Sequence, residues 1–136
     1  MSAMETFTVE GNRLTLLTEG PARLDALVAL IDGARRSLRI LYYIYADAES
    51  GRRVNEALLA AAARGVRVAL IVDGFGSDAA SRKHFFDPLA AAGISICWFA
   101  PRFGRRYLLR NHQKLALADE ARIMIGGFNI ANDYFA

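Results

Sequence analysis

The chain has 136 residues, with 17 lysine and arginine side chains against 14 aspartate and glutamate side chains, and therefore a net charge of +3. This length suits one domain spanning residues 1–136, and an apolar content of 54% is enough for a hydrophobic core. The single cysteine, Cys97, excludes an internal disulfide, and its apolar neighbours predict a small buried side chain in a reducing compartment. With two histidines and one cysteine, we expect no zinc site, and no motif calls for a cofactor.

Positive charge gathers in the second half of the chain. Between residues 88 and 118 every charged side chain is basic: Arg102, Arg105, Arg106, Arg110 and Lys114. Such a stretch suits a phosphate, a nucleic-acid backbone or an acidic lipid headgroup, and it equally suits a solvated loop. The longest apolar stretches, 38–46 and 68–72, are too short to cross a bilayer, so we expect any lipid substrate to be reached from the membrane surface.

Apolar periodicity predicts alternating strands and helices along the chain. Strands are expected at 13–17, 38–45, 66–72 and 94–99, and helices from Pro21 to Ile31, over 52–64 with Gly65 as its cap, and over 79–92 ending at Gly93. Residues 100–110 are expected to be irregular. This order predicts an α/β fold with a mixed, largely parallel β-sheet flanked by helices on both faces.

The end of the chain carries the residues with the clearest chemistry. His112 and Lys114 are two apart in an expected strand over 112–118, so both side chains point to the same face, where one phosphate can touch an imidazole and an ammonium. Residues 119–121 predict a turn and 122–125 its hairpin partner. Gly126 and Gly127 allow close approach of backbone or ligand, and the amide of Asn129 can donate to a phosphate oxygen.

These residues form the pattern His-x-Lys-x4-Asp, with Asp119 as its acid, followed by Gly-Gly-x-Asn. The pattern resembles the signature of the phospholipase D superfamily. Residues 12–136 are similar throughout to the first half of bacterial cardiolipin synthases and related phospholipase D-like proteins. Shared features include Asp47…Gly51, Ala57-Leu58, Arg64-Gly65-Val66, Val72-Asp73-Gly74, Gly76-Ser77 and Ala92-Gly93-Ile94.

The resemblance implies a phosphodiesterase or phosphatidyltransferase acting on phospholipids through a phosphohistidine. His112 would be the nucleophile or the general acid, Lys114, Gly127 and Asn129 would bind the phosphate, and Asp119 would steady the site. Members of this family normally carry two copies of the signature, whose histidines face one another. Here it occurs once and only residues 130–136 follow Asn129, so we expect the N-terminal half of a two-motif protein, peripheral on the cytoplasmic face of the membrane.

Two departures from the family pattern are visible. Gln113 stands where relatives often have arginine, and Leu41-Tyr42-Tyr43 lacks a carboxylate that many relatives carry there. We expect Tyr42, Tyr43 and Tyr45 to pack in the core. The glycine-containing segment 73–77 is expected to form a turn after a strand. His84 is expected to be a surface side chain.

Two other functions remain open from the residues alone. One is a nuclease of the same superfamily that completes its site as a homodimer, which the basic segment 102–110 permits. The other is a catalytically silent domain that binds an anionic partner, which intact His112 and Lys114 argue against. Lipid turnover and DNA cleavage by the same protein distinguish these functions.

Overall fold

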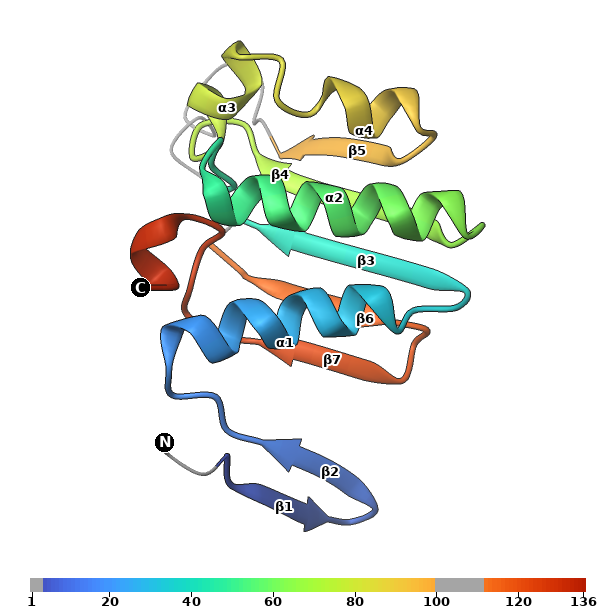
Figure 1. Cartoon of the computed structure of the whole chain (residues 1–136), viewed down its shortest axis with the longest axis vertical. Helices are drawn as coiled ribbons and strands as arrows, with labels where there is room; N and C mark the ends of the chain where they lie inside the picture. The colour runs from blue at the N-terminus through green and yellow to red at the C-terminus, as the bar shows by residue number, and fades with distance from the viewer. Residues whose placement is uncertain (1–3, 100–111) are drawn as a thin grey trace.

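A computed structural model describes residues 4–99 and 112–136 of the chain (Figure 1). In chain order the elements are β1 (Thr6–Val9), β2 (Asn12–Thr15), α1 (Gly20–Asp32), β3 (Ser37–Tyr42), α2 (Glu49–Ala63), β4 (Arg67–Asp73), α3 (Asp78–Arg82), α4 (Asp87–Ala91), β5 (Ser95–Phe99), β6 (Leu115–Ala118), β7 (Arg122–Ile125) and the 3-10 helix η2 (Asn132–Tyr134). The irregular segment expected at 100–110, with its arginines, lies outside the described residues.

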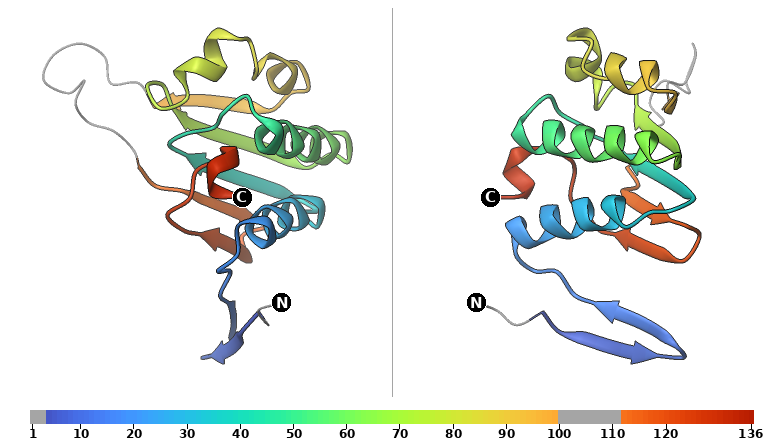
Figure 2. Two further views of the ribbon diagram at one scale, coloured as in Figure 1. Left: turned by 60° about the vertical axis from the view of Figure 1, so that its left-hand side comes forward. Right: turned by 45° about the vertical axis from the view of Figure 1, so that its right-hand side comes forward.

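The main sheet has the strand order β5-β4-β3-β6-β7. β3 pairs in parallel with β4, and β4 with β5, whereas β6 pairs antiparallel with both β3 and β7. The predicted α/β fold with a mixed sheet flanked by helices is therefore confirmed, with parallel pairing on one side of β3 and antiparallel pairing on the other. β1 and β2 form a separate hairpin that extends away from the sheet (Figures 1 and 2).

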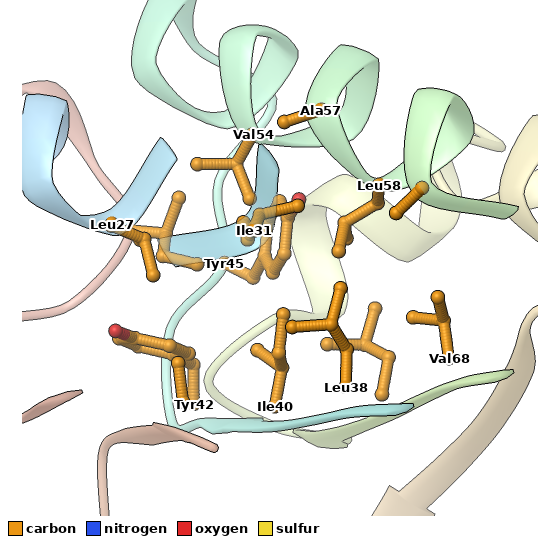
Figure 3. Packing of buried hydrophobic residues seen from close by; sticks show 14 of the residues in the cluster. Leu27, Ile31, Leu38, Ile40, Tyr42, Tyr45, Val54, Ala57, Leu58 and Val68 are labelled. Atoms are coloured by element: carbon orange, nitrogen blue, oxygen red, sulfur yellow. The ribbon is translucent and has the colours of Figure 1, made fainter. Parts of the chain in front are cut away.

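Helices α1 and α2 pack side by side on one face of the main sheet (Figure 2). Their apolar stripes meet alternate residues of the central strands, and this packing forms the core shown in Figure 3: Leu27, Ile31, Leu38, Ile40, Tyr42, Val54, Leu58 and Val68. Helix α2 ends where the sequence predicts, because Gly65 has φ +87°, a conformation that glycine adopts without strain. The core thus fixes the central strands whose ends carry the candidate site.

The opposite face of the sheet is not covered by a helix within the described residues. Ile123 and Ile125 are 59% and 68% exposed on this face, and Cys97 on β5 is also exposed. Helices were expected on both faces, and the described ones lie on the side of α1 and α2. The prediction that Cys97 is buried is wrong, because its side chain alternates onto the open face of an edge strand.

The helix expected over 79–92 is interrupted. The structure has two short helices, α3 and α4, separated by a turn in which His84 has φ +57°. Pro88 explains the break, because proline lacks an N–H and is tolerated only in the first turn of a helix, where it lies in α4. His84 is exposed, as predicted, and its Nδ1 lies 3.0 Å from Asp87 Oδ2.

Candidate active site

The signature residues and the ends of two central strands meet at one edge of the main sheet. Because β6 runs antiparallel to β3 and β7, its N-terminal end lies beside the C-terminal ends of those strands, where Leu115 pairs with Leu41 and Ile125. Residues 112–114 enter β6 at this edge and residues 126–129 leave β7 there. The turn after β4 reaches the same edge, since β4 is parallel to β3.

His112 and Lys114 both lie against the ring of Tyr43, which directly follows β3. The imidazole of His112 stacks on the tyrosine ring with a centroid distance of 3.9 Å and an interplanar angle of 19°. Lys114 Nζ lies 5.8 Å from the centroid of the same ring and donates a hydrogen bond to the backbone oxygen of His112. Strand β6 begins only at Leu115, later than predicted, yet the two side chains are brought together as the spacing indicated.

Asn129 is buried, with 4% of its surface exposed. Its Oδ1 accepts a hydrogen bond of 3.0 Å from the backbone N–H of Ile44, and its Nδ2 donates one of 3.2 Å to the hydroxyl of Tyr134. The amide that was expected to donate to a phosphate therefore has protein partners on both sides. It ties the segment after β7 to the segment after β3.

The turn after β4 supports the same segment. Ser77 Oγ donates to the backbone oxygen of Tyr43 and accepts from the backbone N–H of Tyr45, each at 3.0 Å. The turn itself is closed by Asp73, whose Oδ1 accepts from the N–H groups of Phe75 and Gly76. The prediction of a turn at 73–77 is confirmed, and its function in this structure is to hold the end of β3.

Asp119 lies at the far end of the sheet from His112 and Lys114. The four residues of β6 separate it from Lys114, a distance of roughly 15 Å at the usual rise of a strand. Its carboxylate accepts hydrogen bonds of 2.7–3.2 Å from the backbone N–H groups of Arg35, Arg36 and Ser37. These bonds favour the charged form and lower the pKa of Asp119 to about 2. The structure therefore places Asp119 as an anchor of the segment that leads into β3.

Gly127 is exposed, and a Cβ added there would meet nothing within 4 Å. The space beside its backbone is therefore open, as an approaching phosphate requires.

Within the described residues, no three histidine, cysteine, aspartate or glutamate side chains gather in a way that could hold a metal ion. None of the described helices is both long and apolar enough to cross a membrane.

The sequence did not single out Tyr43 as a site residue. Core packing was expected for three tyrosines, and Tyr42 and Tyr45 are indeed buried, which raises the pKa of both hydroxyls. Tyr43 instead faces His112. The signal that could have identified it is alternation, because a tyrosine next to a buried Tyr42 in an extended segment points to the other side.

The fold of the chain is similar to that of two solved proteins. The crystal structure of Nuc from Salmonella typhimurium, a phospholipase D family member, matches with a TM-score of 0.67 and 26% identity, covering 85% of this chain and 68% of that chain. NucT from Helicobacter pylori matches with a TM-score of 0.65 over 83% of this chain and 70% of that chain; at 20% identity it supports the fold alone. Fold and signature together define a phospholipase D-like domain.

A family model described as "Cardiolipin synthase, PLD-like domain" matches residues 27–136. The chain belongs to this family, which confirms the resemblance seen in the sequence. It is 36% identical over 123 residues to cardiolipin synthase 1 of Bacillus cereus, covering 88% of this chain and 24% of that protein. It is 34% identical over 129 residues to the major cardiolipin synthase ClsA of Bacillus subtilis, covering 92% of this chain and 27% of that protein. The chain thus spans about a quarter of the length of these relatives.

Proposed function

We propose that this chain supplies one half of the active site of a phosphatidyltransferase or phosphodiesterase that acts on phospholipids. The observation that carries the proposal is the pairing of an exposed His112 with Lys114 in a domain of the cardiolipin synthase family. An imidazole can attack phosphorus or protonate a leaving alcohol near neutral pH. A lysine ammonium beside it can neutralise a non-bridging phosphate oxygen.

In the proposed reaction His112 is the nucleophile. One imidazole nitrogen attacks the phosphorus of a phosphodiester, the bond to the leaving alcohol breaks, and that alcohol departs with a proton from a general acid. A second alcohol or water then attacks the phosphohistidine and breaks its phosphorus–nitrogen bond, which frees His112. The group that acted as the acid, now deprotonated, accepts the proton of the incoming alcohol or water. Lys114 holds charge on the non-bridging oxygens, and Gly127 leaves room for them.

Asn129 and Asp119 support the site through the fold in this proposal. The side-chain amide of Asn129 is hydrogen-bonded to the Ile44 N–H and to the Tyr134 hydroxyl. Asp119 accepts hydrogen bonds from three backbone N–H groups at the far end of β6. The general acid is the histidine of a second His-x-Lys-x4-Asp half, provided by the same protein or by a partner copy. Substrate is met at a membrane surface, on the cytoplasmic side, without a membrane span in the described helices.

The proposal is tested by comparing wild type with His112→Ala on phosphatidylglycerol vesicles, with cardiolipin formation as the readout. We expect the substitution to lower turnover by roughly a thousandfold or more, because it removes the attacking group. His84→Ala is the matched control, since His84 is exposed and its ring pairs with Asp87 in its own segment. Adding a second signature-bearing half in trans tests whether one half alone is incomplete.

The alternative is a nuclease of the same superfamily that acts as a homodimer. The basic side chains of the arginine segment, 102–110, favour it, because phosphate backbones bind such stretches in a salt-dependent manner. Plasmid DNA is therefore included as a second substrate. Cleavage of DNA dependent on His112, without lipid turnover in any combination of halves, would replace the lipid proposal with this one.

A further inference from the structure

We propose that Tyr43 is a positioning residue for His112: its ring holds the imidazole in one orientation with Lys114 alongside. This inference rests on the proposed function, in which His112 is the nucleophile, and adds a residue outside the signature to the site. An exposed imidazole without such a contact would sample several rotamers.

The contact between the two rings is a close, nearly parallel stack. The centroids are 3.9 Å apart and the planes differ by 19°, so the face of Tyr43 covers the face of His112. A tyrosine face carries partial negative charge, which favours a positively charged group placed over it. Lys114 Nζ lies 5.8 Å from the same centroid, within the range of that attraction. One ring therefore contacts both groups that the proposed chemistry assigns to the phosphate.

The ring can orient His112 only if Tyr43 is itself fixed, and the turn after β4 does this. Ser77 Oγ donates to the backbone oxygen of Tyr43 at 3.0 Å. Gly76 packs directly against it, because a Cβ at position 76 would lie 2.5 Å from that oxygen and 3.0 Å from Cε2 of the ring. No side chain larger than hydrogen fits there without moving Tyr43. The glycine thus allows the turn to press against the tyrosine.

Asn129 fixes the next residue from the other side. Its Oδ1 accepts from the N–H of Ile44, and Ile130 N–H donates to the Ile44 oxygen at 3.0 Å. The segment after β7 therefore clamps the peptide that follows Tyr43. The signature asparagine and the Gly76–Ser77 turn act on one tyrosine, which in turn contacts the signature histidine.

The contact requires the ring and not the hydroxyl. This separates Tyr43→Phe, which keeps the ring face, from Tyr43→Leu, which removes it while keeping an apolar side chain. Phe7→Leu is the matched control, because Phe7 lies exposed on the hairpin β1–β2, away from the main sheet (Figure 1). Any general effect of replacing an aromatic side chain with leucine will appear in this control.

The first measurement is the proton NMR spectrum of the histidine rings, which needs no turnover. A ring stacked on tyrosine has its protons shifted upfield by the ring current, so the His112 signals should move downfield in Tyr43→Leu and stay in place in Tyr43→Phe. His84 serves as the internal reference, since its ring contacts Asp87 in its own segment. His112 signals that are identical in all three proteins would overturn the proposal.

The second measurement is steady-state kinetics with phosphatidylglycerol vesicles and, where required, the second half. We expect Tyr43→Leu to lower kcat by roughly 10–100-fold with little change in KM, because a misplaced nucleophile affects the chemical step, and Tyr43→Phe to retain activity within about threefold. Wild-type kcat in Tyr43→Leu would refute the positioning role. A wild-type protein that turns over no lipid refutes the proposed function instead, and the NMR result then decides the placement of His112 by itself.

Discussion

Replacing Asn129 with alanine separates two roles for the signature asparagine, a ligand of phosphate and a clamp on the end of β3. In the structure its amide makes two internal hydrogen bonds, to the Ile44 N–H at 3.0 Å and to the Tyr134 hydroxyl at 3.2 Å. Removing it leaves the Ile44 N–H without its acceptor, at a cost of about 1–3 kcal/mol, and loses the bond to Tyr134, worth about 1 kcal/mol. We expect the free energy of unfolding to fall by about 2–4 kcal/mol.

Urea denaturation followed by fluorescence of the single tryptophan, Trp98, measures this change. Tyr134→Phe is the matched control, because it removes only the second bond and should cost about 1 kcal/mol. The double variant should be less destabilised than the sum of the two single variants, since both remove the same Asn129–Tyr134 contact.

A different result follows if Asn129 acts only on substrate. Its removal would then lower activity while the free energy of unfolding stays within about 0.5 kcal/mol of wild type. That outcome would refute the clamp, and with it the reasoning that assigns Asn129 to the protein interior. Loss of both stability and activity is the result that the contacts lead us to expect.

Two further predictions concern residues away from the site. Asp119 has a folded-state pKa of about 2, below its ordinary value of 3.8, so its contribution to stability is complete above about pH 4 and is lost as the pH falls through about 2. The urea midpoints of wild type and Asp119→Asn should therefore converge between pH 4 and pH 2. Parallel pH profiles of the two proteins would contradict this prediction. Cys97 is exposed on the open face of the sheet, so the folded protein should react with a thiol reagent such as DTNB at a rate similar to that of the urea-unfolded chain, whereas protection by folding would show that this face is covered.

Much of the fold could be predicted from the sequence because its elements follow strong local patterns. Continuous apolar runs predicted β3 and β4, and Gly65 predicted the end of α2. The division into α3 and α4 could also be predicted locally, since Pro88 is not tolerated in the interior of a helix. The exposure of Cys97 could not be predicted locally. It depends on which face of the sheet the helices cover, and the apolar neighbours of Cys97 in its strand do not reveal that face.

The geometry of the candidate site was predictable in part for the same reason. The two-residue spacing of His112 and Lys114 is a local property, and the structure brings both side chains to one ring. Asp119 is close to them in sequence but a whole strand away in space, which a linear signature does not show. The contribution of Tyr43 depends on the pairing of β3 with β6, and such long-range pairing is not visible in periodicity.

The clamp on residues 43–45 has a consequence for how the protein folds. Its hydrogen bonds join residues 32 and 85 positions apart in the chain, and they draw on the turn after β4 and the segment after β7. Contacts of such high sequence separation form slowly. The entropy of closing a long loop is lost before the contact contributes any favourable free energy. The candidate site is therefore expected to be completed among the last events of folding, and a peptide containing only residues 112–129 would carry the whole signature without its geometry.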